Sequence, residues 1–219
     1  MKNLKPVIIL LFLLLGTKTV FSQATVSAGL AYGSFDYDVS GTKYTGDGGV
    51  LSLDGQLSPS ITYSLSMSDG KIDDRAYSNS EGSVTYNVYQ NIGVHFMGSQ
   101  IKLANVQETD TSLGFSYNIY ASTLAIKAFA GSDINNYGKF YTYGTKVNLG
   151  VARGSSLILS YKTEDRKQKA TTMEARFIYD LTSNLGLNVG YKSTETKDAT
   201  GNAVALKGNT TYAGIMYRF

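Results

Sequence analysis

Few side chains in this sequence have the chemistry of a catalytic or metal-binding group, and they do not cluster. The chain of 219 residues contains one histidine, His95, and no cysteine. Without cysteine there is no thiolate nucleophile, no disulfide and no cysteine-based zinc site, and one imidazole cannot form a histidine metal cluster. Ser99 follows His95 after four positions, in a stretch that we expect to be a loop. This spacing is a poor arrangement for a serine nucleophile and its base.

The paired carboxylates and the glycine-rich segment are weak signals as well. Residues 133–138 partly match a calcium-binding loop, but the oxygen ligand at the fifth position and the distal glutamate are missing. Residues 46–49 lack the following lysine and helix of a phosphate-binding loop. Two pairs of adjacent carboxylates fall in expected loops and are interpreted as solvated: Asp73 with Asp74, and Glu164 with Asp165. The sequence therefore predicts no catalytic residue, no metal and no cofactor.

Residues 1–24 have the layout of a secretory signal peptide. A short lysine-containing region precedes an unbroken run of nine apolar residues, 7–15, and small and polar residues follow. Nine apolar residues are too few to span a bilayer as a helix. We expect cleavage after Ala24, with cleavage after Ser22 as the alternative.

Residues 25–219, which we expect to form one domain, carry no net charge once the signal peptide is removed. The whole chain has 20 Lys and Arg against 17 Asp and Glu, and three of the lysines lie in residues 1–24. The remaining 17 basic residues balance the 17 acidic ones. A nucleic-acid partner held by a basic surface is therefore not expected.

The rest of the chain shows apolar residues that alternate with polar ones at a period of two. In residues 60–68, isoleucine, tyrosine, leucine and methionine alternate with serine and threonine. Successive side chains of a strand point to opposite faces, so this pattern indicates strands with one apolar face. The same division recurs in residues 113–119, 141–151, 173–181 and 185–191.

Two kinds of connection separate these strands. Short turns are expected near residues 57–60, 89–91, 120–122, 152–156 and 181–184. Longer polar stretches, which we interpret as external loops, cover residues 38–48, 69–82, 98–110, 131–138, 162–170 and 193–209. Six hairpins result, and hence an antiparallel up-and-down barrel of about twelve strands. Ten or fourteen strands remain open, because residues 86–100 keep one parity through the proposed turn.

The position of the charges favours a transmembrane barrel over a soluble one. The apolar face of the clean strands carries no Asp, Glu, Lys or Arg, whereas the opposite face carries small and polar residues with a few charges. An apolar outside and a wet inside fit a barrel in lipid. Tyrosines near the expected strand ends fit interfacial girdles: Tyr32, Tyr37, Tyr63, Tyr89, Tyr120, Tyr161 and Tyr191.

The last strand carries a family resemblance. Residues 212–219, Tyr-Ala-Gly-Ile-Met-Tyr-Arg-Phe, resemble the C-terminal strand of Gram-negative outer-membrane β-barrel proteins, and residues 179–185 are similar to a turn common near the end of porins. The resemblance covers roughly the last 45 residues. It implies outer-membrane insertion and an assembly signal at Phe219 that the barrel-assembly machinery reads. General porins are longer, with about sixteen strands and an inward constriction loop, so their pore residues are not carried over.

The expected inward face decides between a channel and a plugged barrel. Its uncharged members are short and polar, which favours a water-filled lumen: Ser64, Ser66, Thr85, Asn87, Ser116, Asn118, Thr142, Asn148, Ser160 and Asn188. Its charged members are the candidate pore-lining residues: Asp54, Lys127, Lys146, Glu174, Arg176 and Arg218. Four cations against two acids predict a preference for anionic or neutral solutes. The alternative is that Lys146, Glu174 and Arg176 pair across the lumen and only support the structure.

A barrel enzyme is the rival class of function. Lipid-hydrolysing outer-membrane barrels carry a His-x-Ser signature, whereas here Phe96 and Met97 follow His95, whose parity points inward. We therefore expect no catalysis and a porin-like channel for small hydrophilic solutes, in contact with outer-membrane lipid and lipopolysaccharide. A plugged structural or adhesin-type barrel that acts through its external loops is the alternative.

Overall fold

The computed structural model describes residues 25–89, 91–103, 106–135, 138–165, 169–197 and 204–219. The predicted signal peptide lies outside these residues. The described part of the chain folds into β1 (Thr25–Val39), β2 (Thr42–Ser58), β3 (Ile61–Ile72), β4 (Arg75–Tyr89), β5 (Ile92–Leu103), β6 (Val106–Ala121), β7 (Leu124–Asn135), β8 (Gly138–Ala152), β9 (Ser155–Asp165), β10 (Ala170–Asp180), β11 (Leu185–Lys197) and β12 (Val204–Arg218). Within it there is no helix of the length and hydropathy needed to cross a membrane.

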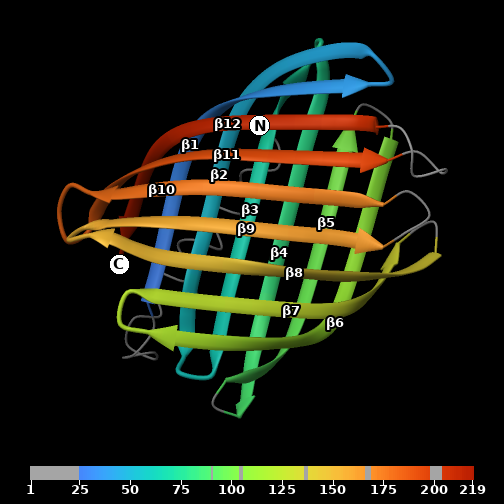
Figure 1. Cartoon of the computed structure of the whole chain (residues 1–219). Helices are drawn as coiled ribbons and strands as arrows, with labels where there is room; N and C mark the ends of the chain where they lie inside the picture. Colours follow the sequence, from blue (N-terminus) through green and yellow to red (C-terminus); the bar gives the residue numbers. More distant parts are fainter. Residues whose placement is uncertain (1–24, 90, 104–105, 136–137, 166–168, 198–203) are drawn as a thin grey trace.

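The twelve strands form one closed antiparallel barrel (Figure 1). Each strand pairs with the next, and β12 returns to pair with β1, from Arg218 opposite Ser27 to Leu206 opposite Val39. Closure leaves no unpaired strand edge, which is the condition for placing a sheet in lipid. The prediction of a twelve-stranded up-and-down barrel is confirmed.

The ambiguous stretch of residues 86–100 contains a turn. β4 ends at Tyr89 and β5 begins at Ile92, and the two strands pair from Tyr89 opposite Ile92 to Tyr77 opposite Leu103. The register of the pair shifts by one residue between Asn87 and Tyr89. Because of this shift, the even-numbered apolar residues before and after the turn lie on the same face of the sheet.

The strands extend further than the polar pattern predicts. Most of the six stretches interpreted as external loops belong to strands, and the hairpins between β1 and β2 and between β3 and β4 close with two residues each. Ser40 and Gly41 in the first, and Asp73 and Asp74 in the second, all have positive φ, as tight hairpins with the favoured twist require. Polar composition was a poor guide because a strand beyond the apolar band needs no apolar face.

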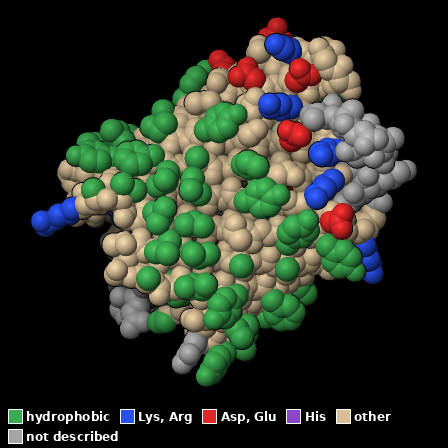
Figure 2. Space-filling view, in the orientation of Figure 1, with side chains coloured by type: hydrophobic (Ala, Val, Ile, Leu, Met, Phe, Trp, Pro, Cys, Tyr) green, Lys and Arg blue, Asp and Glu red, His purple; other side chains and the backbone are tan. Residues whose placement is uncertain are grey.

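The two ends of the barrel differ in what they carry. The terminal end holds both ends of the described chain, together with the described turns around residues 59–60, 122–123, 153–154 and 181–184. The distal end is the end at which β1, β3, β5, β7, β9 and β11 finish and the strands that follow them begin. Charged side chains gather at the distal end, whereas hydrophobic side chains cover the middle of the visible face (Figure 2).

Alternation separates the outer surface from the lumen as expected. Phe115 is 69% exposed on the outside, while its neighbours Gly114 and Ser116 are buried on the inside. Tyr141 is 66% exposed and Thr142 beside it is buried. Tyr37 is an exception to the predicted girdle: it points inward and its hydroxyl donates to that of Tyr77.

Glycines shape one corner of the barrel at the distal end. A β-carbon on either Gly46 or Gly70 would collide with a backbone carbonyl of the neighbouring strand, so the two backbones approach closely and only glycine fits there. Phe35 is opposite Gly46 and Tyr77 is opposite Gly70 in the register. The two rings, with centroids 5.2 Å apart, fill the space that the glycines leave.

Candidate functional site in the lumen

The six charged residues predicted to line the lumen all occupy inward-facing positions. They are Asp54 on β2, Lys127 on β7, Lys146 on β8, Glu174 and Arg176 on β10, and Arg218 on β12. Their side chains are not equivalent, because some are engaged in ion pairs and others are not. Their contribution to solute selectivity stays a prediction.

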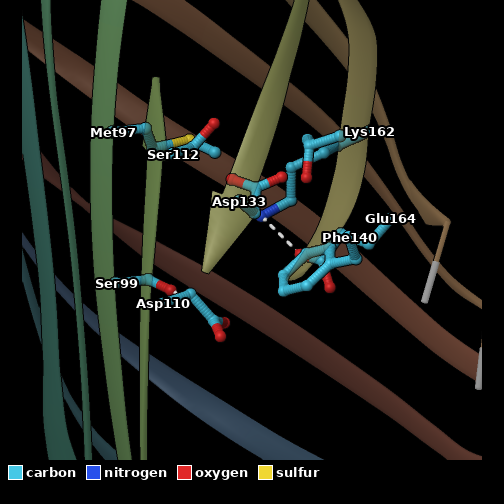
Figure 3. Close-up of a pocket in the computed structure, with 9 residues that line it drawn as sticks. Met97, Ser99, Asp110, Ser112, Asp133, Phe140, Lys162 and Glu164 are labelled. Atoms are coloured by element: carbon cyan, nitrogen blue, oxygen red, sulfur yellow. Dashed lines mark hydrogen bonds and ion pairs between the residues drawn. The ribbon is translucent and has the colours of Figure 1, made fainter. Parts of the chain in front are cut away.

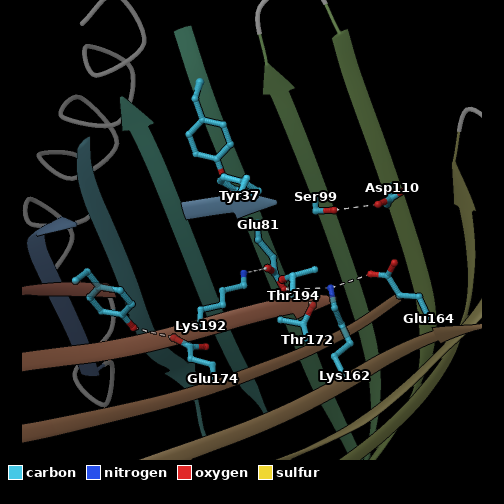
Figure 4. A network of polar contacts seen from close by, with 12 residues as sticks. Tyr37, Glu81, Ser99, Asp110, Lys162, Glu164, Thr172, Glu174, Lys192 and Thr194 are labelled. Atoms are coloured by element: carbon cyan, nitrogen blue, oxygen red, sulfur yellow. Dashed lines mark hydrogen bonds and ion pairs between the residues drawn. The ribbon is translucent and has the colours of Figure 1, made fainter. Parts of the chain in front are cut away.

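Arg176 and Glu174 bind partners on other strands. Nη1 of Arg176 lies 3.5 Å from Oδ2 of Asp54, which joins β10 to β2 inside the barrel. The hydroxyl of Tyr212 donates to Oε1 of Glu174 at 2.8 Å (Figure 4). The alternative named pairing among Lys146, Glu174 and Arg176, whereas the contacts found here join Arg176 to Asp54 and Glu174 to Tyr212.

A second group of charges crosses the middle of the lumen. Oε2 of Glu81 on β4 lies 3.4 Å from Nζ of Lys192 on β11, and Oε1 lies 3.9 Å from Nζ of Lys162 on β9. Lys162 also contacts Glu164 at 3.1 Å (Figure 4). The carboxylate of Glu81 thus connects β4 to β9 and β11 across the lumen through two lysines. We call Glu81, Lys162 and Lys192 the central bridge.

Arg218 lies at the terminal end of the lumen. Its Nη1 donates to Oδ1 of Asp180 at 2.5 Å, and its backbone carbonyl accepts from Nδ2 of Asn184. The ammonium or guanidinium of every inward cation described so far has a carboxylate partner. Such pairing supports the walls and reduces the net field that a solute meets.

Lys127 and Lys146 form the exception. They are directly opposite each other on β7 and β8 and both face the lumen. Nζ of Lys127 donates to Oγ1 of Thr85 at 2.6 Å and lies 3.2 Å from Nδ1 of His95. An ammonium has no lone pair, so Nδ1 of His95 is an acceptor in this contact. In the described part of the chain, neither lysine forms an ion pair with a carboxylate.

A small pocket near the distal end is lined by acids and hydroxyls. Asp110, Asp133 and Glu164 share it with Lys162, whose ammonium points to Glu164 (Figure 3). Asp133 is 2% exposed in β7, so its interpretation as part of a polar hairpin tip was wrong. Glu164 is likewise part of β9 rather than a solvated loop. No three described acids or imidazoles converge with the spacing of metal ligands.

Large apolar side chains also enter the lumen, which differs from the short polar lining that the sequence predicted. Phe35, Ile72 and Tyr77 pack together at the distal end, with Tyr37 and Tyr44 against them. Ile158, Ile178 and Met216 pack together nearer the terminal end. The sequence pattern did not predict these inward apolar residues, because each one stands singly among polar residues on its strand. The lumen is therefore narrower than strand number alone indicates.

The central bridge is the main feature that sequence reasoning missed. Glu81, Lys162 and Lys192 lie in or beside stretches that composition assigned to external loops. Residues 77–82, Tyr-Ser-Asn-Ser-Glu-Gly, are polar or small on both faces, so the apolar alternation gave no signal there. Ser99 was also placed in a loop, yet it lies on β5, where its hydroxyl donates to Asp110. The inward orientation of His95 was predicted correctly.

No protein-family model matches the sequence. No curated protein matches it either. Solved structures, in contrast, share its fold. The NanC porin aligns with a TM-score of 0.56 at 11% identity, covering 86% of this chain and 98% of that chain. The translocator domain of the autotransporter NalP from Neisseria meningitidis aligns with a TM-score of 0.55 at 10% identity, covering 93% and 92%.

A third similar structure is the COG4313 outer membrane channel from Pseudomonas putida F1. It aligns with a TM-score of 0.54 at 13% identity, covering 90% of this chain and 95% of that chain. The chain thus has the fold of outer-membrane porins and channels, as the C-terminal resemblance implied. At identities this low the likeness concerns the fold, which porins and an autotransporter domain share, so function must be argued from the lumen.

Proposed function

We propose that this protein is an outer-membrane channel through which small hydrophilic solutes diffuse passively. The observation that carries the proposal is the division of the barrel wall. Large apolar side chains are exposed around the outside, whereas every described charged residue of the central bridge and the lysine pair faces the inside. A soluble barrel has the reverse need, because water would surround its outer face.

The outer surface supports placement in a bilayer. Leu30 on β1, Leu113 on β6 and Met173 on β10 are all more than half exposed, so the apolar surface extends around the barrel. Exposed apolar area on this scale is unfavourable in water and favourable in lipid. A charge at the outer midplane would cost about 2–4 kcal/mol in a bilayer, which explains why the charges are internal.

The lumen supports passage of small polar solutes. Ser66, Asn148 and Gly150 face inward and are nonetheless exposed, so solvent reaches the inner wall at these positions. The central bridge and the pair of Asp54 with Arg176 narrow the path between opposite walls. Such a bore favours small hydrated solutes over large ones.

Catalysis has little support in this lumen. His95 is engaged by Thr85 and Lys127, and Ser99 is bound to Asp110 on the neighbouring strand. A serine nucleophile needs a base within hydrogen-bonding reach, and these two residues serve other partners. We therefore propose transport without a reaction and without a cofactor.

A plugged barrel is the second candidate. The apolar clusters near the two ends of the lumen are the observation in its favour. The clusters around Phe35 and Ile178 occupy inner space near both ends, and ion pairs cross the middle. A barrel filled in this way would act as a scaffold or adhesin through its distal end. Lipopolysaccharide would then be a contact of the distal charges rather than a neighbour of a pore.

Single-channel recording distinguishes the two candidates. The mature chain, residues 25–219, is refolded and added to a planar bilayer with a salt gradient. Reproducible conductance steps support the channel, and the reversal potential gives the sign of the preferred ion. A protein that is folded, as judged by its heat-dependent mobility on a gel, yet produces no steps would overturn the channel and favour the plugged barrel.

Export and assembly form a separate part of the proposal. Residues 1–24 act as the cleaved signal peptide, and Phe219 acts as the assembly signal for the barrel-assembly machinery. The ring of Phe219 packs edge-on against Tyr217 at 4.7 Å, and its backbone nitrogen donates to Val26 on β1 at 2.9 Å. Deletion of Phe219 should lower the amount of assembled barrel in the outer membrane, measured by the heat-modifiable band. An unchanged amount would contradict the role.

Placement in lipid is tested by a matched pair of substitutions. Leu187→Arg puts a cation on the exposed outer face, and Ser66→Arg puts one on the solvent-accessible inner wall opposite Glu81. Only Leu187→Arg should prevent stable insertion into vesicles. Equal insertion of the two variants would argue against the bilayer.

A further inference from the structure

The charges of the lumen divide into compensated and uncompensated cations. Lys162 and Lys192 share Glu81, Arg176 contacts Asp54, and Arg218 contacts Asp180. Lys127 and Lys146 alone among the inward cations discussed have no carboxylate within ion-pair distance in the described chain. Two positive charges are thus concentrated on the wall formed by β7 and β8.

The arrangement of this pair is unfavourable unless something neutralises it. Like charges directly opposite each other on neighbouring strands repel. Thr85 and His95, which contact Lys127, are uncharged acceptors in these contacts and supply no negative charge. Glu81 is within electrostatic reach of Lys146, but its two oxygens already face Lys162 and Lys192. The lysine pair therefore has no carboxylate of its own among the described residues and shares the field of Glu81 with two other lysines.

The surroundings of the pair provide both access and further hydrogen-bonding groups. Asn148, two residues beyond Lys146 on the same face of β8, is exposed to the solvent of the lumen. Ser160 on β9 is opposite Lys146, and Asn118 on β6 is opposite Lys127. A row of polar residues therefore crosses four strands with the two lysines at its centre.

We propose that Lys127 and Lys146 form an oxyanion-binding site in the lumen, which takes the carboxylate or phosphate group of a small solute. Each ammonium donates a charge-assisted hydrogen bond to one oxygen of the anion, and the hydroxyl of Ser160 donates a third. The bound anion supplies the counterion that the wall lacks. The inference rests on the proposed function, because a solute reaches the pair through an open lumen.

Binding of inorganic phosphate to the refolded protein in detergent micelles tests the site. Titration calorimetry is run on the wild type, Lys127→Gln, Lys146→Gln and the control Lys139→Gln. Lys139 lies on the same strand as Lys146 but is exposed at the distal end, outside the pair. We expect saturable binding that weakens about tenfold or more in each variant of the pair and is unchanged in the control. Lys146→Arg, which keeps the charge, should restore binding if Lys146→Gln folds poorly.

The two sources of the oxyanion are separated by competition. Acetate that displaces phosphate shows that a carboxylate is accepted, and displacement by a phosphate monoester alone restricts the site to phosphates. Absence of saturable phosphate binding in the folded wild type, or equal weakening in Lys139→Gln, overturns the inference.

Failure of the site and failure of the channel give different results. Conductance steps without phosphate binding overturn the site and leave the channel. Phosphate binding that depends on both lysines, in a protein that produces no conductance steps, supports the site and overturns the channel.

Discussion

Within the described strands, charged side chains are paired with opposite charges in one part of the lumen wall and left without a carboxylate partner in another. The walls built from β2, β4 and β9–β12 hold cations and acids in contact with each other, as in the central bridge of Glu81, Lys162 and Lys192. The wall built from β7 and β8 holds Lys127 and Lys146 side by side without a carboxylate partner among the described residues. Paired charges hold opposite walls together, whereas the unpaired ones are available to a solute.

The difference has an energetic consequence that mutations can reveal. Removing one partner of an ion pair leaves the other charge uncompensated in a partly dehydrated space, which destabilises the barrel. Removing one of two like charges relieves repulsion and does the opposite. Substitutions in the two walls should therefore change the free energy of unfolding in opposite directions.

The largest effect is expected for Glu81→Gln. The substitution leaves Lys162 without its β4 partner and Lys192 without its carboxylate, so two ammonium groups lose compensation at once. We expect a loss of about 2–3 kcal/mol in the free energy of unfolding, less than for a fully buried pair because these side chains are 18–32% exposed. Urea unfolding in micelles measures it. Conductance should rise at the same time, since the bridge no longer spans the lumen; a stability equal to that of the wild type would contradict the bridge.

A smaller effect is expected for Asp54→Asn. Arg176 would lose its one carboxylate contact across the lumen, although Glu174 remains on the same strand. The guanidinium is 11% exposed at its side chain, so the loss should reach about 1–2 kcal/mol in the same urea experiment. The double variant Asp54→Asn with Arg176→Met serves as the control and should recover part of the loss. No recovery would mean that Asp54 acts through another group.

The sequence predicted the barrel better than it predicted the lumen. Strand number, closure and the two faces follow from a period-two pattern that lipid and lumen impose on every strand, and residues such as Leu113 and Ser116 report it directly. The candidate charges on the clean strands, Lys146 and Arg176 among them, were therefore placed on the correct face.

The central bridge could not be found in the same way. Glu81 and Lys192 lie on strands far apart in the sequence, and only barrel closure and register bring them within 3.4 Å. Composition also misled, because Asp, Lys and Gly near the distal end indicate loops in a soluble protein but are compatible with a strand that faces water on both sides. Inward Phe35 was hidden for a related reason: its partner Gly46, on the next strand, makes room for it.

A modest effect is expected for Tyr212→Phe, which removes a hydroxyl and keeps the ring. Oε1 of Glu174 would lose the hydrogen bond of 2.8 Å, while the packing of the ring on Ala31 and Val50 would remain. We expect a loss of about 1 kcal/mol in the free energy of unfolding. Tyr191→Phe, whose hydroxyl bonds Asn209 at an exposed site, is the matched control and should change the stability by less. Equal changes in the two variants would show that Glu174 has other partners of equal strength.

The smallest effect is expected for Lys146→Gln, and its sign separates the two walls. In phosphate-free buffer the substitution relieves the repulsion with Lys127 without removing an ion pair, so the free energy of unfolding should rise by about 0.5 kcal/mol. Lys192→Gln is the matched comparison among the paired charges, because it removes a lysine that contacts Glu81 and should lower the stability. Low ionic strength enlarges both changes, since salt screens charges that are open to solvent. A loss of stability in Lys146→Gln would place this lysine with the paired charges, because a residue whose removal destabilises the empty barrel must have a partner within it.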